Sequence, residues 1–400
     1  MPQRVPDPIR WKAPMTATID HGTYFTLLPR EYYLSPEVYE KEIDLVFLRS
    51  WHYAGHVSEI LNAGNFFTVD VLGESVIISR DREGDIHALL NVCRHRGFPV
   101  CREQSGTARA FVCGYHSWSY GLDGNLKKAP SINDGAQIDY ADWGLHKVRL
   151  EVWRGLIFIC LGEPRSTSVA AELEAVAGDF VRLDPEHIRK IHEESYDIDA
   201  NWKVLLENYQ ECYHCTGTHP ELCVTMDLEE MYRETGSSRP VAEFYGGGTP
   251  KKPGVVSLSI DGQPVSKRFL GEFGQGAEMP AGFHAGFAIQ PMLSRGDFSV
   301  DHGVIHTLRP LGPDRVRWTT RWFVHQDAVE GEDYELDKLT AVWQATNHED
   351  LTLVTGAFKG VKSRRFVPGP LSSDREPALK QTMSLYLKMM GDDIGAAHAT

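Results

Sequence analysis

The sequence has little that would place the protein in a membrane or outside the cell. No stretch approaches the ~20 consecutive apolar residues of a membrane-spanning helix, and the opening MPQRVPDPIRWKAPM has no apolar run typical of a signal peptide. Basic residues are in deficit, because 41 Lys and Arg stand against 55 Asp and Glu and give a formal net charge of −14. Such a charge disfavours non-specific binding to nucleic acid or to an anionic membrane. We therefore expect a cytoplasmic protein that binds neither.

Two further absences narrow the chemistry. The sequence has no GxGxxG fingerprint, and the glycine-rich YGGGTP at 245–250 has no strand–helix context, so no flavin- or nicotinamide-binding region is expected. The cysteine count is odd, which without a signal peptide favours reduced thiols and metal ligands over a disulfide framework. The cysteines are Cys93, Cys101, Cys113, Cys160, Cys212, Cys215 and Cys223.

Hydrophobic patterning predicts an α+β protein in three parts. SPEVYEKEIDLVFLRSW begins with Ser35 as a candidate N-cap and Pro36 at the first helical position, and its apolar residues recur at helical spacing. From about Asn65, β-branched and aromatic runs alternate with turn residues, which indicates an all-β unit. We expect a helical N-terminal segment that packs on the last domain, then the all-β domain, then an antiparallel sheet covered by helices, at 1–51, 52–163 and 164–400.

The last part mixes helical and strand patterns. NWKVLLENYQECYHC, at 201–215, reads as a helix buried on one side, and the Gly-, Pro- and Ser-rich stretch 236–282 reads as loops. We expect strands near 284–292, 298–309 and 315–325, a long helix over 334–361 and a further helix near 376–390.

The first group of candidate metal ligands lies where predicted strands give way to loops. Cys93 and His95 are separated by one residue, and Cys113 and His116 by two. A structural Cys₂His₂ zinc site is one interpretation, but zinc fingers usually place their cysteines together and their histidines together. Each half here supplies one of each, which favours a Rieske-type [2Fe-2S] cluster with two Cys on one iron and two His on the other.

The second group lies in ENYQECYHCTGTH. His214 and His219 are five residues apart, which on a continuous helix turns them about 140° from a common face. They can meet at one metal if the helix ends between them, and Gly217 offers such a break. Two imidazoles and one carboxylate form the facial triad of non-haem Fe(II) oxygenases. NHEDLTLV offers Asp350, with Glu349, His348 and Glu211 as rival ligands. Asp350 or Glu349 could instead lie on a solvated helix face and bind no metal.

These motifs together resemble those of the large (α) subunit of Rieske non-haem iron oxygenases. CRHRG with CGYHSW matches the family's cluster motif, ENYQECYHCTGTH its helix with two iron histidines, and NHEDLTLV the segment of the third ligand. The resemblance covers about residues 32–387. It implies a Rieske domain and a helix-grip-like catalytic domain, and it selects Asp350 as the third ligand of the mononuclear iron.

The resemblance also implies partners and a role for Glu211. Family members form rings, usually homotrimers, in which a carboxylate three residues before the first iron histidine bridges to the cluster of the neighbouring subunit. Here that residue is Glu211, within ECYHC, a form typical of the branch that acts on glycine betaine, stachydrine and carnitine. Electrons would come from a separate flavin- and ferredoxin-type reductase that uses NAD(P)H.

The sequence leaves the substrate open. For a quaternary ammonium substrate, an aromatic cage would act by cation–π attraction, and Arg295 or Arg309 could meet a carboxylate. Cage candidates, each of which can equally be core, are Tyr209, Phe283, Phe287, Trp318 and Trp322. N-demethylation of a small N-methylated compound is the leading hypothesis. An aromatic-ring hydroxylating oxygenase, with or without a β subunit, is the alternative. A Rieske electron-transfer protein or zinc-stabilised binding module is a third hypothesis.

Overall fold

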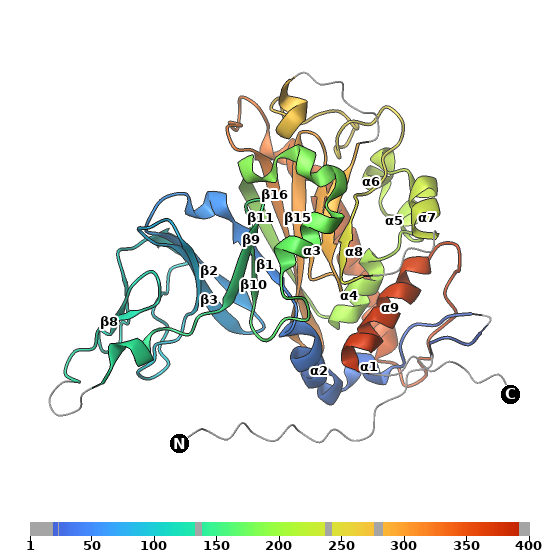
Figure 1. Ribbon diagram of the computed structural model, residues 1–400. Coiled ribbons are helices and arrows are strands. Elements are labelled where there is room, and N and C mark those ends of the chain that lie inside the picture. Colours follow the sequence, from blue (N-terminus) through green and yellow to red (C-terminus); the bar gives the residue numbers. More distant parts are fainter. Residues whose placement is uncertain (1–18, 23, 133–137, 237–241, 276–282, 392–400) are drawn as a thin grey trace.

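The computed structural model describes residues 19–22, 24–132, 138–236, 242–275 and 283–391 (Figure 1). Outside this description lie residues 1–18 and 23 of the predicted N-terminal segment and 237–241 and 276–282 of the predicted loops. Within the described ranges, no helix is both long and apolar enough to cross a membrane.

Three small antiparallel sheets form the part of the chain that was predicted to be all-β. Strands β2, β3 and β8 lie on the left of Figure 1, away from the helices. The first sheet has the order β1 (His52–His56), β10 (Leu156–Cys160), β9 (Arg149–Trp153). The second has the order β4 (Ile86–Leu90), β3 (Glu74–Arg80), β2 (Asn65–Val71), β5 (Ser105–Thr107). The third has the order β6 (Phe111–Val112), β7 (Ser119–Tyr120), β8 (Leu126–Lys128).

The turn between β2 and β3 shows how the local sequence sets strand pairing. Val71 pairs with Glu74, which leaves Leu72 and Gly73 as a two-residue loop with φ of 55° and 80°. Positive φ at both central positions is the type I′ geometry, whose twist matches that of the flanking strands. The run that begins at Asn65 within the predicted all-β unit therefore forms two strands joined as a tight hairpin.

A six-stranded antiparallel sheet forms the centre of the larger part of the chain. Its order is β11 (Ile188–Ile198), β16 (Arg315–His325), β15 (His302–Gly312), β14 (Ser294–Phe298), β13 (Ala285–Ile289), β12 (Phe244–Gly246). The run predicted as one strand near 298–309 is split, because the backbone turns back between Ser299 and His302 (N to O 2.8 Å). The buried carboxylate of Asp301 holds this turn by accepting the N–H groups of Val265 and Ser266. The α+β prediction is confirmed.

Helices cover this sheet (Figure 1). Helix α4 packs against α8 and the neighbouring strands β15 and β16, and side chains such as Trp202, Trp318 and Phe358 share one apolar cluster. The helices of this part are α3 (Val169–Val176), α4 (Trp202–Tyr209), α5 (Cys215–Thr218), α6 (Pro220–Thr225), α7 (Leu228–Gly236), α8 (Leu336–Val361) and α9 (Pro377–Met390).

The predicted N-terminal helix is present and is continued by a turn of π-helix. The short α1 (Glu31–Leu34) precedes α2 (Pro36–Glu42), at whose start Ser35 Oγ accepts the N–H of Val38 at 3.2 Å. The next turn, Ile43–Phe47, is a π-helix. The capping prediction is confirmed.

The prediction of one helix over 201–215 is wrong. Helix α4 ends at Tyr209, and α5 begins only at Cys215, so Gly217 lies inside a helix and makes no break. The carboxylate of Glu211 accepts the backbone N–H of Tyr213. Such local side chain–backbone bonds compete with helical ones, so the chain turns before His214.

A fully buried ion pair ties the N-terminal helices to α4. Glu42 accepts hydrogen bonds from Lys203 Nζ, from Trp202 Nε1 at 2.7 Å and from Tyr386 Oη at 2.6 Å. The side chains of Glu42 and Lys203 are both 0% exposed. Removal of one partner would leave the other charge buried without compensation.

We expect Lys203→Met to lower the free energy of unfolding by about 3–5 kcal/mol, measured by urea denaturation. Lys338→Met is the matched control, because Lys338 pairs with Glu335 at the surface and such exposed pairs contribute about 0–1 kcal/mol. An equal loss of stability in both variants would contradict the structural role of the buried pair.

Candidate metal centres and the adjoining cavity

Two loops of the same backbone conformation hold the first group of ligands. In one, Cys93 N–H donates to Phe98 O at 3.0 Å and Gly97 N–H donates to Cys93 O at 2.9 Å. In the other, Cys113 N–H donates to Trp118 O at 2.8 Å and Ser117 N–H to Cys113 O at 3.0 Å. Gly97 and Ser117, at equivalent positions, have φ of 75° and 58°. The two loops therefore share one backbone turn, although His95 follows its cysteine by two residues and His116 follows its cysteine by three.

Within the first group, the two histidines form one close pair and the two cysteines another. The rings of His95 and His116 lie 4.5 Å apart, and both cysteines are buried. His95 Nδ1 is buried and has no hydrogen-bond partner among the described residues. Burial raises the pKa of the Cys113 thiol, and the neighbouring Cys93 adds to this. Two buried thiols and an imidazole nitrogen without a partner in the described structure are donors of the types that a Rieske [2Fe-2S] cluster uses.

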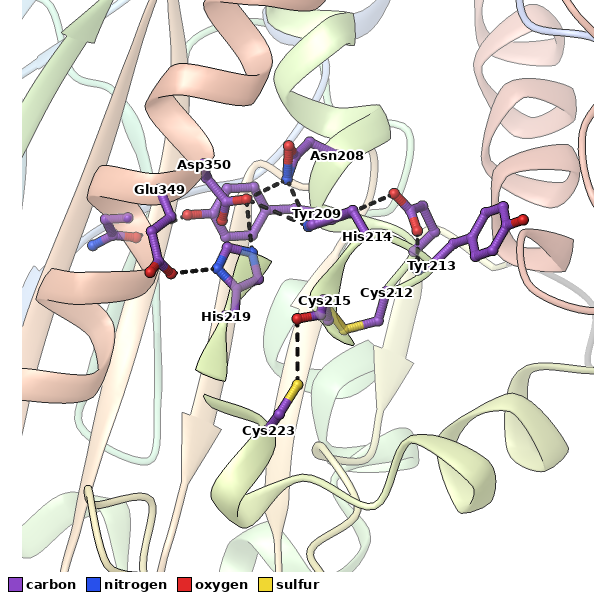
Figure 2. A network of polar contacts seen from close by, with 12 residues as sticks. Asn208, Tyr209, Cys212, Tyr213, His214, Cys215, His219, Cys223, Glu349 and Asp350 are labelled. Atoms are coloured by element: carbon purple, nitrogen blue, oxygen red, sulfur yellow. Dashed lines mark hydrogen bonds and ion pairs between the residues drawn. A yellow bond between two sulfur atoms is a disulfide. The ribbon is translucent and has the colours of Figure 1, made fainter. Parts of the chain in front are cut away.

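The second group meets on one carboxylate oxygen (Figure 2). Asp350 Oδ1 lies 3.1 Å from His219 Nε2 and 3.4 Å from His214 Nε2. Asp350 comes from α8, whereas His214 and His219 flank the four-residue α5 as its N-cap and C-cap, so the two rings are not bound to the spacing of one continuous helix. Two imidazoles and one carboxylate fit a facial triad.

A glutamate holds the outer nitrogen of each imidazole (Figure 2). Glu211 Oε1 lies 2.6 Å from His214 Nδ1, and Glu349 Oε2 lies 2.7 Å from His219 Nδ1. These bonds place a proton on each Nδ1 and leave each Nε2 lone pair available to a metal. The two carboxylates that the sequence left as rival ligands therefore have different positions in the structure. Glu349 meets the far side of a histidine, whereas Asp350 faces both Nε2 atoms.

Electrostatics at this site favour a cation. Burial lowers the pKa of His214, but the hydrogen bonds to Asp350 and Glu211 outweigh burial and raise it to about 9. Burial raises the pKa of Asp350, yet the two histidines overcome this effect and hold it below its usual value. A divalent cation at the two Nε2 atoms would meet the same negative surroundings, because metal binding takes the place of a histidine proton.

Asn208 and Asn347, two neighbours of this site, were not predicted. Asn208 Nδ2 donates to Asp350 Oδ1 at 2.6 Å, and Tyr209 Oη donates to Asn347 Oδ1 at 2.8 Å. Asn208 lies on α4 and Asn347 on α8, so the two helices are joined at the site. His348 bonds to Gln344 O at 2.7 Å and does not join the group.

The expectation of reduced cysteines fails at one pair, because Cys212 and Cys215 form a disulfide. The sulfur of Cys215 lies with nitrogens of His214 and His219 in a group within 4.8 Å. That sulfur is already bonded to Cys212, so Asp350 is the better third donor. The spacing of the two cysteines around His214 was the signal that sequence reasoning did not use. The remaining five cysteines are free, in agreement with the expectation.

A cavity opens beside the histidines and Asp350. Of the predicted cage residues, Tyr209 and Phe287 line it, whereas Phe283, Trp318 and Trp322 are buried outside its wall. Trp318 lies behind Tyr209, with ring centroids 4.2 Å apart. Aromatic lining residues that were not predicted are Tyr232, Tyr245, His306 and Trp343.

Of the two arginines suggested as partners of a substrate carboxylate, only Arg295 lies at the cavity. Arg295 lines the cavity and bonds to Asp297 Oδ2 at 2.9 and 3.1 Å. Arg309 instead donates to the carbonyl oxygens of Asp70 and Tyr53. It therefore joins the small sheets to the large one and does not reach the cavity.

Comparison with known families gives two matches that divide the chain. The family described as ring hydroxylating alpha subunit (catalytic domain) matches residues 185–392, and the Rieske [2Fe-2S] domain matches residues 50–143. The glycine betaine monooxygenase oxygenase subunit of Pseudomonas aeruginosa is 30% identical over 97% of this chain and 94% of its own length. The carnitine monooxygenase oxygenase subunit of Escherichia coli is 28% identical over 85% of each chain.

Solved structures share the fold. The quaternary ammonium Rieske monooxygenase CntA with L-carnitine has a TM-score of 0.69 at 22% identity and covers 92% of this chain and 96% of its own. Naphthalene 1,2-dioxygenase from Rhodococcus has a TM-score of 0.68 at 19% identity, over 91% and 94%. The chain thus belongs to the family of Rieske oxygenase α subunits, O₂-using oxidoreductases that hold a [2Fe-2S] cluster and a mononuclear iron.

Proposed function

We propose that the protein is the terminal oxygenase that removes an N-methyl group from a small quaternary ammonium compound of the betaine type. The observation that carries this proposal is the cavity, which joins the Asp350–histidine group to the aromatic faces of Tyr209, Phe287 and Trp343. A quaternary ammonium has no N–H to donate, so aromatic faces hold it by cation–π attraction, each worth ~0.5–2 kcal/mol. The relatives named for glycine betaine and carnitine support the same class.

The chain's own residues position the reaction. His214, His219 and Asp350 are the proposed iron ligands, and Cys93, His95, Cys113 and His116 the proposed cluster ligands. Iron, when bound, supplies O₂ activation and C–H oxidation. Glu211 and Glu349 fix the orientation of the two imidazoles, and the aromatic wall keeps water from the reacting methyl group. Two electrons, two protons and O₂ then convert the N-methyl group to formaldehyde, with water and the demethylated amine as the other products.

Electrons must come from a partner. The relatives are named oxygenase subunits, which implies a separate component that reduces them. We assign this role to a flavin- and ferredoxin-type reductase that uses NAD(P)H. We also propose that the protein is a cytoplasmic homotrimer. In this trimer, Glu211 links the iron of one subunit to the cluster of the next. The proposed division is 1–51, 52–163 and 164–400, with the cluster in the second part and the iron in the third.

Product analysis tests this function. The holoenzyme, a surrogate reductase, NADH and O₂ are expected to convert a betaine or carnitine-type compound into its demethylated amine with an equal amount of formaldehyde. Mass spectrometry and a formaldehyde assay measure both. Simple aromatic acids serve as the control class. Ring-hydroxylated products with untouched betaines would instead assign the protein to the aromatic branch.

A further inference from the structure

Three aromatic side chains meet at Asn347, three residues before Asp350 on α8. Tyr209 Oη donates to Asn347 Oδ1 at 2.8 Å, and Trp318 Nε1 donates to the same oxygen at 3.1 Å. Asn347 also acts on the hydroxyl of Tyr196 by hydrogen bonding. One amide thus holds in place two phenols and an indole that come from α4, β16 and β11.

The three rings lead from the interior toward the edge of the large sheet. The ring centroids of Tyr209 and Trp318 are 4.2 Å apart. Trp318 on β16 pairs directly with Tyr196 on β11, the strand at one end of the sheet. Such partners point to the same face of a sheet, with Cβ atoms about 4.5–5.5 Å apart. Trp318 is buried and Tyr196 is partly buried, so the series approaches the surface at Tyr196.

The two ends of this series lie in different surroundings. At the inner end, Tyr209 lines the cavity, and burial followed by the nearby Asp350 carboxylate raises its pKa. At the outer end, Tyr196 Oη donates a hydrogen bond to Glu194 Oε2. The side chain of Glu194 is 26% exposed. The series therefore connects a proposed iron ligand to a carboxylate that solvent can reach.

The outer pair is prepared to lose an electron and a proton together. Burial, and then the hydrogen bond to Glu194, raise the pKa of Tyr196, so its phenol stays protonated. Burial raises the pKa of Glu194, but its bonds to Tyr196, His192 and Gln344 outweigh this effect and hold the pKa below its usual value. Glu194 is therefore an ionised acceptor at the phenolic proton.

We propose that Tyr209, Trp318 and Tyr196 carry oxidising equivalents from the iron site to the surface when no substrate occupies the cavity, with Glu194 as the proton acceptor. Tyrosine and tryptophan are readily oxidised by one electron, and neighbouring rings exchange electrons. The protein must also exclude reactions that compete with the intended one. This protective function is separate from demethylation. It rests on the mononuclear iron of the family and not on the identity of the substrate.

The step balances as follows. Tyr196 loses one electron, and its phenolic proton passes to Glu194, which leaves a neutral tyrosyl radical beside a carboxylic acid. The electron passes through Trp318 and Tyr209 and reduces an oxidant derived from O₂ or peroxide at the iron. A thiol in solution then gives a hydrogen atom to the radical and becomes a thiyl radical, and Glu194 releases its proton to water.

Freeze-quench EPR of the holoenzyme tests this path. Hydrogen peroxide is the probe, with substrate absent and the cluster oxidised, and ring-deuterated tyrosine identifies a tyrosyl signal. We expect such a signal in the wild type, its loss in Tyr196→Phe and a weaker signal in Glu194→Gln, which keeps a polar side chain but accepts no proton. Tyr386→Phe is the matched control, because Tyr386 also donates to a carboxylate, Glu42 Oε1 at 2.6 Å, but away from the cavity wall.

Peptide mass spectrometry supplies the second measurement. When the exit at Tyr196 is blocked, we expect oxidation products to accumulate on Tyr209 and Trp318 over repeated peroxide treatment, more than in Tyr386→Phe. A wild type without a tyrosyl signal, or a signal that survives Tyr196→Phe unchanged, would overturn the path. Either result leaves the proposed function standing as long as the wild-type enzyme releases formaldehyde from a betaine, because that assay does not depend on Tyr196.

Discussion

Asp350→Ala is expected to remove the mononuclear iron and to abolish turnover while the Rieske cluster remains. Among the described residues, Asp350 Oδ1 is the carboxylate oxygen that faces both histidine Nε2 atoms, and two imidazoles without it do not complete a facial triad. Loss of a partner outside the ligand set costs ~10–100-fold in metal affinity or activity. Loss of Asp350, the proposed direct ligand, should lower iron affinity by more than that range. Iron content and the visible spectrum of the cluster measure the two metal sites separately.

Glu349→Ala is the matched control for this prediction. Glu349 is the adjacent carboxylate on α8 and bonds to His219 Nδ1 at 2.7 Å, on the far side of the ring. We expect this variant to keep the iron at lower affinity. The opposite result, with iron lost from Glu349→Ala and retained by Asp350→Ala, would exchange the roles of the two residues.

Glu211→Gln is expected to keep both metal centres and to lower turnover by about 10–100-fold. Glu211 holds His214 Nδ1 at 2.6 Å and is 13% exposed, and in the proposed homotrimer it also bonds to a cluster histidine of the next subunit. Loss of its charge weakens its bonds to both histidines of the proposed electron path. The rate at which O₂ and substrate reoxidise the reduced cluster, followed by absorbance in a single turnover, measures this step.

Glu349→Gln again supplies the control, because it changes the equivalent bond to the other imidazole. If the only task of Glu211 is to orient a ligand, the two Gln variants should slow cluster reoxidation equally. A much slower reoxidation in Glu211→Gln supports the bridge between subunits. Unchanged reoxidation with tight coupling of O₂ to product would contradict it.

Local patterns in the sequence predicted much of this protein. The Cys–His pairs at 93–95 and 113–116 predicted the Rieske domain, and the helical period from 334 to 361 predicted α8. The order of these motifs also identified the family. Each of these features depends on residues within a few positions of one another, so the backbone geometry of a turn or helix is enough to predict it.

The tertiary structure decided what depends on contacts between distant segments. Asp350 and Glu349 are neighbours in sequence, and only the packing of α8 against the segment of His214 and His219 shows which one faces the metal site.

The cavity wall depends on the same kind of contact. Trp318 and Trp322 on β16 and His306 on β15 are all buried, but strand pairing and the helices above decide that only His306 reaches the cavity. Apolar periodicity reports which side chains are buried. It does not report whether a buried side chain meets another side chain or a substrate, because that depends on how the elements pack in three dimensions.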